Sequence, residues 1–399
     1  MGVYFLENEI QAYNWGSPDW IPEILGIDNP EGEPMAELWM GVHPKAPSKV
    51  RKGKNLISLD RYIAENPAGV LGRSAAEKFA DRLPFLFKVL AAGRPLSIQA
   101  HPDKSQAEAG YRRENDKGIP VDAFERNYRD ENHKPEIICA LTDFHAMRGF
   151  RPVDEIIEEF RFILSGTDTP IYIPEGGESE LRPFFDSILS VPQEQVGGLI
   201  SLALEKIQHL DDIRYEWVRK LSEHYPEDIG VLCPFFLNLI VLHRGDAMFL
   251  PAGELHAYLH GLGVELMANS DNVLRGGLTS KHVAKQELLE VLTFRAEKPA
   301  ILKPRAGRTG EAVYSVPIDE FALAVLDLDN GDEYTSEEGR NVEIYFCEEG
   351  EGVLRTASGG KDSGQTQIRF AKGDSWIVPA SAGTYSMQGR AKLYRAAVP

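Results

Sequence analysis

The segment "SIQAHPDKS" (97–105) places side chains that could bind a metal ion on one face of a short extended stretch. Neighbouring residues of a β-strand point to opposite faces, so Ser97, Gln99 and His101 project together. Pro102 then ends the strand, because it cannot donate a ladder hydrogen bond. Amide oxygen and imidazole nitrogen are both metal donors. The spacing predicts two ligands from one strand, although an isolated strand histidine is commonly structural.

Two further candidate ligands, Glu136 and His256, lie in other stretches that are predicted to be strands. Metal sites in β-barrels take their ligands from several adjacent strands, so large sequence gaps between ligands are expected. Only Glu136 would bring a negative charge, which would leave a divalent ion partly uncompensated. Mixed nitrogen and oxygen donors suit zinc, cobalt, manganese or iron. Spacing alone therefore leaves both the site and the metal open.

An internal repeat indicates the architecture that would position these residues. "GDAMFLPAGELHAYLHG" (245–261) and "GDSWIVPASAGTYSMQG" (373–389) align without gaps as a turn, a strand, a proline turn and a second strand. Such units are typical of double-sheet jelly-roll barrels, which cupins use. His256 aligns with Thr384, so the metal-capable histidine occurs in the first copy only. We predict a mainly β fold with two jelly-roll, cupin-like barrels and an α-helical domain.

Changes in apolar periodicity predict the domain boundaries. From Pro152 to about residue 228, apolar residues recur at helical spacing, which predicts a helical insert that covers the barrel. Helices are also expected within 59–83 and 281–292, strand pairs within 84–102 and 133–150, and a charged loop beside the site over 112–118 and 124–134. The predicted domains are a first barrel over 1–151 with 229–295, the insert over 152–228, a linker over 296–310 and a second barrel over 311–399.

Composition limits the classes of partner. The net charge of −18 opposes binding to nucleic acid or to an anionic membrane, because such a field repels phosphate. The longest apolar run, 230–242, is shorter than the roughly 20 residues of a membrane span. Three cysteines at no metal-ligand spacing, and no basic-then-apolar signal, indicate a reducing compartment. We expect a cytoplasmic protein, monomeric in solution, with a small-molecule substrate.

Several motifs together resemble one enzyme family. They are "YNWGS" (13–17), "FLFKVLAAGRPLSIQAHPDK" (85–104), "NHKPEIICAL" (132–141) and "PAGELHAYLHGLGVELMANSDNVLRGGLTSKH" (251–282). In this order they resemble type I mannose-6-phosphate isomerase, a zinc-dependent family, over about residues 1–295.

The resemblance implies one Zn²⁺ per chain, bound by Gln99, His101, Glu136 and His256, and a catalytic role for Arg275. It also implies interconversion of mannose 6-phosphate and fructose 6-phosphate, which feeds GDP-mannose synthesis or allows growth on mannose. Removing a proton beside a carbonyl builds negative charge on oxygen, and a Lewis acid stabilises that charge by several kcal/mol.

The remaining roles are less determined by the sequence. Lys134 shares a strand face with Glu136 and is a candidate base, since a nearby cation should lower its pKa; an ordinary strand-end lysine is the alternative. Asp271 is a further candidate, against an Asx-turn role. Arg275 could hold phosphate or stabilise the enediolate. The other candidate substrate contacts are Ser97, Lys88 and Lys281, with Lys104 as a possible member of the same positive cluster.

Two other functions compete with the isomerase. A non-catalytic sugar-phosphate-binding double cupin would keep the scaffold without turnover, and the complete set of candidate ligands argues against it. A cupin-type oxygenase would use two histidines and one carboxylate with open positions, so the additional Gln99 does not suit it.

Overall fold

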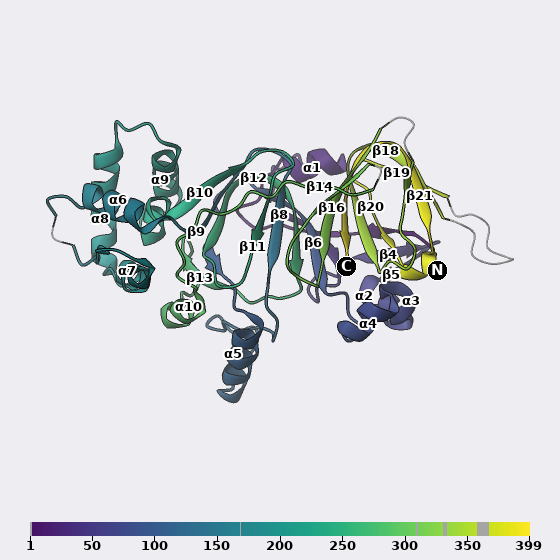
Figure 1. The fold of residues 1–399 in the computed structure, drawn as a ribbon, viewed down its shortest axis with the longest axis horizontal. Helices are drawn as coiled ribbons and strands as arrows, with labels where there is room; N and C mark the ends of the chain where they lie inside the picture. The colour runs from purple at the N-terminus through teal and green to yellow at the C-terminus, as the bar shows by residue number, and fades with distance from the viewer. Residues whose placement is uncertain (1, 168, 309, 330–332, 357–366) are drawn as a thin grey trace.

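The computed structural model describes residues 2–167, 169–308, 310–329, 333–356 and 367–399. Figure 1 shows two bodies of β-strands side by side, with the helices α6 to α9 at one end and α2 to α4 beside the C-terminal strands. The predicted mainly β architecture with an α-helical region is confirmed. Among the described residues, no helix has both the length and the apolar character needed to cross a bilayer.

The strands of the first sheet carry the candidate ligands Gln99, Glu136 and His256, and His101 directly follows one of these strands. They are β2 (Glu9–Gln11), β3 (Glu37–Gly41), β6 (Phe85–Ala92), β7 (Ile98–Ala100), β8 (Glu136–Ala140), β9 (Phe144–Phe150), β10 (Leu237–Leu242), β11 (Ala247–Leu250), β12 (His256–Ala268) and β13 (Leu274–Gly277). β12 pairs with β7 and β9 through its first half and with β6 and β8 through its second half. This one strand therefore connects most of the sheet.

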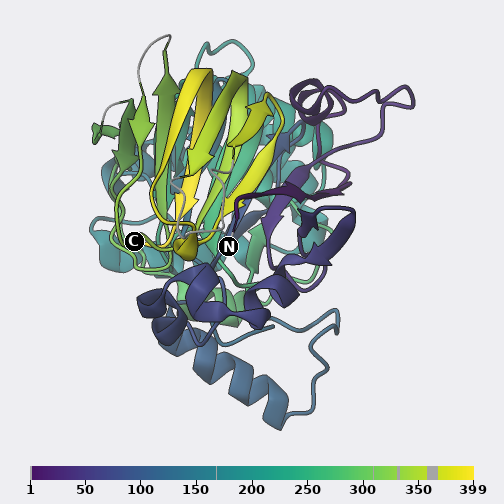
Figure 2. The ribbon, with the colours of Figure 1, turned by 90° about the vertical axis from the view of Figure 1, so that its right-hand side faces the viewer.

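The second sheet contains the C-terminal strands and three from the N-terminal region. Its members are β1 (Tyr4–Glu7), β4 (Lys49–Lys52), β5 (Asn55–Ser58), β14 (Arg305–Ala306), β15 (Glu311–Tyr314), β16 (Ala322–Leu328), β17 (Tyr334–Thr335), β18 (Glu343–Thr356), β19 (Gln367–Ala371), β20 (Ser375–Val378) and β21 (Tyr385–Ala397). Because β1 pairs with β20, residues near the N-terminus complete a sheet made mostly from the other end of the chain. Figure 2 shows this sheet facing the viewer, with α5 below it.

The helices lie outside the sheets. They are α1 (Trp20–Leu25), α2 (Leu59–Glu65), α3 (Pro67–Leu71), α4 (Arg73–Lys78), α5 (Lys104–Asp116), α6 (Val153–Ile163), α7 (Leu181–Leu189), α8 (Gln193–Ile207), α9 (Ile213–His224) and α10 (Lys285–Val291). The apolar stripes predicted over 152–228 form α6, α8 and α9, and they share one core with barrel residues such as Ile98 and Met147. The insert is therefore packed on the first sheet.

The internal repeat has the same local structure in both copies. The two strands of the first copy are β11 and β12, and those of the second are β20 and β21. Gly245 and Gly373 begin the copies with φ of +85° and +89°, which favours glycine. The next residue repeats one contact: an Oδ2 atom of Asp246, and of Asp374, accepts the backbone N–H of the residue three positions earlier. The same glycine turn and the same aspartate contact therefore precede the first strand of each copy.

Two sequence-based expectations about local structure are wrong. The segments 84–102 and 133–150 do contain strands, but their strands are not paired with each other; β6 to β9 all pair with β12. Residues 112–116 belong to helix α5 rather than to a loop. A capping box begins this helix, because Asp103 accepts the N–H of Gln106 while the Gln106 side chain accepts the N–H of Asp103.

Candidate metal centre

Three of the predicted ligands converge inside the first barrel. His101 follows β7, Glu136 begins β8 and His256 begins β12, and each side chain is almost completely buried. The Nε2 atom of His101 lies 3.5 Å from Oε1 of Glu136, and Nε2 of His256 lies 3.5 Å from Oε2 of the same carboxylate. One donor atom from each residue falls within 4.8 Å of the others.

Backbone contacts fix the tautomer of both histidines. The Nδ1 atom of His101 lies 2.7 Å from the carbonyl oxygen of Asn272, and Nδ1 of His256 lies 3.0 Å from that of Glu254. A carbonyl oxygen can only accept, so each Nδ1 carries the proton and each Nε2 exposes its lone pair. Both lone pairs therefore face the Glu136 carboxylate.

This arrangement of acceptors calls for a cation. The buried atoms His101 Nε2, His256 Nε2 and Glu136 Oε2 have no hydrogen-bond partner among the described residues. Such groups cost free energy when they are left unpaired, and three acceptors that face one another repel. A divalent metal ion satisfies all three at once, and two imidazoles with a carboxylate are donors that Zn²⁺ accepts. The residues present therefore fit the metal.

The electrostatics keep the donors in their metal-binding forms. Burial and the nearby charge of Lys134 lower the pKa of His101 to about 4, so the imidazole stays neutral at neutral pH. Burial alone would raise the pKa of Glu136, but Lys134 and His101 outweigh that effect and hold it well below its usual range. His101 is thus a neutral nitrogen donor and Glu136 an ionised carboxylate at neutral pH.

Gln99 is placed beside this group by strand register. It lies on β7 directly opposite His256 of β12 on one side and Arg275 of β13 on the other. Side chains of directly opposite residues share a face of the sheet. Gln99, His256 and Arg275 therefore line the same surface, and the role of Gln99 as a fourth ligand stays a prediction.

Lys134 is the closest cation to the candidate ligands. Its side chain is buried, and its Nζ lies 2.8 Å from Oε1 of Glu136. The strand-end lysine that the sequence left as an alternative would be solvated, whereas this ammonium group is enclosed beside the site. Lys134 therefore lies in direct contact with the candidate ligand Glu136, and its role in the reaction stays a prediction.

A group of cations lies near Arg275. The guanidinium of Arg275 is half-buried and has no hydrogen bond or ion pair among the described residues. Burial, followed by the charge of Arg129, lowers its pKa; burial, Arg275, Arg129 and Lys45 lower that of Lys281. These effects show that several positive side chains lie near one another, although the net charge of the protein is negative. Arg129 was missed by the sequence analysis, because one arginine in a charged loop carries no distinctive spacing.

Lys88 lies in a buried ion-pair network rather than at an open surface. Its Nζ is 2.8 Å from Glu265 and 3.3 Å from Glu37, and Trp39 donates its indole N–H to Glu37. Burial opposes the charged lysine, but the two carboxylates raise the pKa of Lys88 above its usual value. Glu37 and Glu265 were not predicted, although an acidic residue inside an apolar strand ("AELWM", "GVELMA") is a usable signal of an internal ion pair.

The other predicted substrate contacts, Asp271, Ser97 and Lys104, are more exposed to solvent than the three convergent metal ligands. Asp271 accepts from Nζ of Lys45 at 3.1 Å and lies 3.2 Å from Nε2 of the buried His43, and these partners hold its pKa well below the usual range. Ser97 is half-buried, two positions before Gln99. Lys104 is exposed, and its Nζ donates to the carbonyl of Glu131.

The loop from 117 to 135 is tied to the candidate ligands by Asn272. The buried amide oxygen of Asn272 accepts the backbone N–H of Arg129 and of Asp130, while its carbonyl holds His101. Through Asn272, the segment that carries Arg129 and the imidazole of His101 are positioned together. The sequence "SDN" contained this residue, but nothing in its spacing distinguished it.

Comparisons with known proteins agree with this geometry. The catalytic-domain model of type I phosphomannose isomerase matches residues 3–153, and the cupin-domain model of mannose-6-phosphate isomerase matches residues 311–398. The chain is 38% identical to mannose-6-phosphate isomerase of Escherichia coli over 98% of both chains, and 34% identical to the Homo sapiens protein over 82% of both. A zinc-bound crystal structure of mannose 6-phosphate isomerase matches all of both chains with 36% identity and a TM-score of 0.91.

Proposed function

Since the chain belongs to the type I phosphomannose isomerase family, we infer that it is a metal-dependent aldose–ketose isomerase that interconverts mannose 6-phosphate and fructose 6-phosphate. The observation that carries the inference is the set of three convergent, unpartnered donors, His101, Glu136 and His256, held by backbone contacts in their metal-binding tautomers. A bound Zn²⁺ supplies Lewis-acid stabilisation for negative charge that develops on a sugar oxygen.

The residues around the donors support distinct roles. Isomerisation moves a proton from the carbon beside the sugar carbonyl to the carbonyl carbon itself, through an enediol, while the carbonyl passes to the neighbouring carbon. Lys134 is enclosed beside Glu136, and we propose that it carries a proton at this position. Arg275 has no protein partner among the described residues, so its guanidinium is free to stabilise the oxyanion that forms when the proton leaves. Gln99, on the same face, would complete the ligand set.

The cationic rim supports binding of the phosphate. After burial, the charge of Arg129 lowers the pKa of Arg275, and both arginines lower that of Lys281, so the three gather positive charge in a chain whose net charge is negative. A phosphate group would neutralise this repulsion, and an arginine fork can bind it in a bidentate way. Lys88 is held by two carboxylates, so we propose that it acts through Glu265 and Glu37 in the barrel rather than as a direct phosphate ligand.

Chelation tests the isomerase function directly. Turnover of mannose 6-phosphate should disappear after dialysis against a chelator and return when zinc is added, because the donors then recover their cation. A protein that binds mannose 6-phosphate without turnover in the zinc-loaded form would be the non-catalytic binding protein. Oxygen consumption by the metal-loaded protein would identify a cupin-type oxygenase instead.

The cellular context is also a proposal. The free cysteines Cys139, Cys233 and Cys347 are buried, which supports a reducing cytoplasm. We propose that the enzyme acts there as a monomer, away from nucleic acid and membranes, in agreement with its acidic charge. Sedimentation at several protein concentrations would reveal a dimer if this proposal is wrong.

A further inference from the structure

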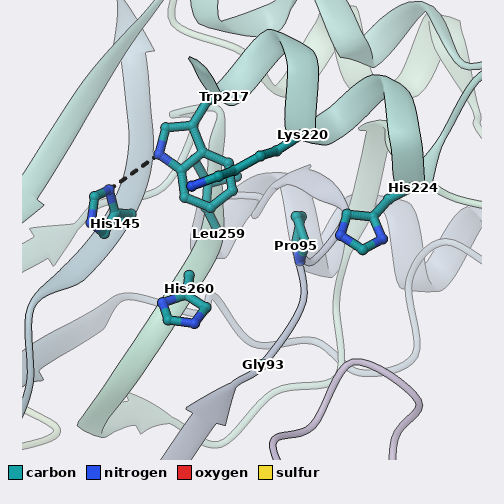
Figure 3. A pocket seen from close by; sticks show the side chains of 8 residues that line it. All are labelled: Gly93, Pro95, His145, Trp217, Lys220, His224, Leu259 and His260. Carbon is teal, nitrogen blue, oxygen red and sulfur yellow. Dashed lines mark hydrogen bonds between the residues drawn. The ribbon is translucent and has the colours of Figure 1, made fainter. Parts of the chain in front are cut away.

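A pocket of about 260 Å³, separate from the candidate metal centre, lies between the helical insert and the first sheet. Figure 3 shows its walls: helix α9 carries Trp217, Lys220 and His224, strand β9 carries His145 and strand β12 carries His260. The remaining lining residues are Gly93, Pro95 and Leu259. Neither the predicted metal ligands nor the cationic residues around Arg275 contribute to it.

The titratable residues that line the pocket are all basic. Its titratable groups are a lysine and three histidines, and none of the lining residues is acidic. Burial and then Lys220 lower the pKa of His260, while burial, His260 and Lys220 lower that of His145. Positive charge on His145 is thus disfavoured by His260 and Lys220, against the smaller opposite effect of Asp143 and Glu216. An anion placed among them would remove this repulsion and accept their N–H groups.

Two contacts prepare the pocket to donate hydrogen bonds. The indole N–H of Trp217 donates to Nδ1 of His145 at 3.1 Å, so the proton of the neutral imidazole resides on Nε2. The Lys220 ammonium lies 4.8 Å from the centroid of the Trp217 ring. Its only ion pair among the described residues is with Glu216, at 2.6 Å, and both side chains are about half exposed. Such an exposed pair contributes little, so Lys220 can turn to an anion.

The pocket is separate from the metal centre but is connected to it by secondary structure. His145 on β9 is opposite His260 on β12, and Arg148 on the same strand is opposite the ligand His256. On another wall, Tyr225 donates to the carbonyl of Pro95 in the segment that leads to Gln99. An occupant of the pocket would therefore contact the strands that carry the candidate ligands.

We propose that this pocket is a second binding site for a small oxyanion, the phosphate or carboxylate group of a metabolite, distinct from the catalytic centre. Lys220 supplies the charge, the imidazoles supply N–H donors and the indole supplies an apolar wall. The volume admits an oxyanion with a small body and excludes a macromolecule.

The indole resonance of Trp217 provides a local probe. We would titrate the ¹⁵N-labelled, zinc-loaded protein with inorganic phosphate and, separately, with acetate, and identify the Trp217 indole signal with Trp217→Phe. At least one of the two anions should shift this signal saturably. In Lys220→Met, which keeps the side-chain stem over the ring, the apparent Kd should rise about tenfold or more.

Two controls separate the pocket from other anion effects. Lys206→Met removes the same charge from helix α8 outside the pocket and should leave the titration unchanged. Arg275→Ala should also leave it unchanged, since a signal lost in that variant would report occupancy of the catalytic centre. The proposal is overturned if neither anion moves the Trp217 signal, if Lys220→Met has no effect, or if Arg275→Ala abolishes the shift. None of these outcomes depends on isomerase turnover.

Discussion

The two barrels place a glutamate at the same position and use it in opposite ways. Glu136 begins β8 and lies opposite Leu250 of β11, while Glu343 begins β18 and lies opposite Val378 of β20. Leu250 and Val378 are aligned in the internal repeat. Both carboxylates are 1% exposed. They are therefore equivalent positions in the two copies, with different partners.

In the second barrel the carboxylate is fully paired by protein groups. One oxygen of Glu343 accepts from Arg395 at 2.6 Å, and the other accepts from the Tyr385 hydroxyl at 2.5 Å. The Tyr385 hydroxyl in turn forms a hydrogen bond with the Tyr345 hydroxyl. Thr384 stands where the first copy has His256. The second barrel therefore has no imidazole at this position, and its carboxylate is paired with an arginine and a tyrosine hydroxyl instead.

The two barrels show that one fold can satisfy a buried carboxylate either with its own side chains or with a bound ion. A barrel that closes its interior with donors on its own side chains has no use for a cation, and its carboxylate contributes to folding. In the first barrel Lys134 contacts one oxygen of the carboxylate, while the other oxygen and two imidazole acceptors are left to an ion, so this carboxylate can contribute to chemistry. Equivalent substitutions in the two copies should therefore have different consequences.

The largest expected effect is that of His256→Ala. Removing this donor should abolish metal binding and reduce turnover of mannose 6-phosphate by a factor of about a thousand or more, since the metal contributes several kcal/mol. Metal analysis and a coupled assay measure both. Thr384→Ala, the aligned change in the second barrel, should alter neither. Metal at wild-type stoichiometry in His256→Ala would refute the assignment of this ligand.

Glu343→Gln should affect folding instead of chemistry. The neutral amide removes one of the two carboxylate partners of Arg395, the other being Glu311, and the ion pair with Arg340, which should lower the free energy of unfolding by about 3 kcal/mol. Urea unfolding measures this loss, and metal content should not change. Glu9→Gln, which breaks the exposed pair with Lys49, should cost less than about 1 kcal/mol. An equal cost for both substitutions would show that the network does not stabilise the second barrel.

Arg275→Ala should separate binding of the metal from catalysis. The variant should keep its zinc, because the donors are untouched, yet lose turnover by a factor of about a hundred, as for the loss of one transition-state donor. Steady-state kinetics with metal analysis provide the measurement. Arg112→Ala, an exposed change on helix α5, is the matched control. Kinetics identical to wild type would mean that Arg275 has no role in the reaction.

The smallest expected effect concerns a carboxylate where the barrels meet. Glu348 on β18 pairs with Arg244 of the first barrel at 2.8 Å, and burial raises its pKa from 4.5 to about 7. Folding thus favours the protonated form: this stabilisation is complete below pH 4.5 and is lost as the pH rises through about 7.

Glu348→Gln should remove that pH dependence. Relative to wild type, the variant should gain on the order of 2 kcal/mol between about pH 4.5 and pH 8, measured by urea unfolding at each pH. Glu349→Gln, at the neighbouring exposed position, should show no comparable trend. A constant difference between Glu348→Gln and wild type across this range would contradict the shifted titration.

Local patterns in the sequence predicted much of the fold. Alternating and helical spacing located β7 and helices α6, α8 and α9, and the repeat located β11, β12, β20 and β21, because each is encoded by a few adjacent residues. Helix α7 and the helical start of α5 were missed. Strand pairing was wrong for 84–102, since β6 and β7 each find a partner in β12, and no local pattern specifies a partner so distant.

The same distinction between local motifs and long-range contacts applies to the residues of the candidate site. His101, Glu136 and His256 were predicted, because the motifs "QAHPDK", "HKPE" and "ELHAY" identify them through resemblance, and they do meet. Glu265, Arg129 and Asn272 were not, because their contributions arise from contacts across the barrel. Lys88 was predicted to contact the substrate, which stays a prediction, and only the structure reveals that two carboxylates already hold it.

The strand β12 also determines when the site can form. Its pairs with β6, β7, β8 and β9 join residues made early in synthesis to one made late, and the contact that orients His101 spans 171 positions. A nascent chain therefore exposes isolated donors until the insert has been translated and β12 has docked. Such long-range closure is slow. In small zinc modules the ion organises the chain; in this protein we expect the ion to bind only after β12 has paired with its neighbouring strands.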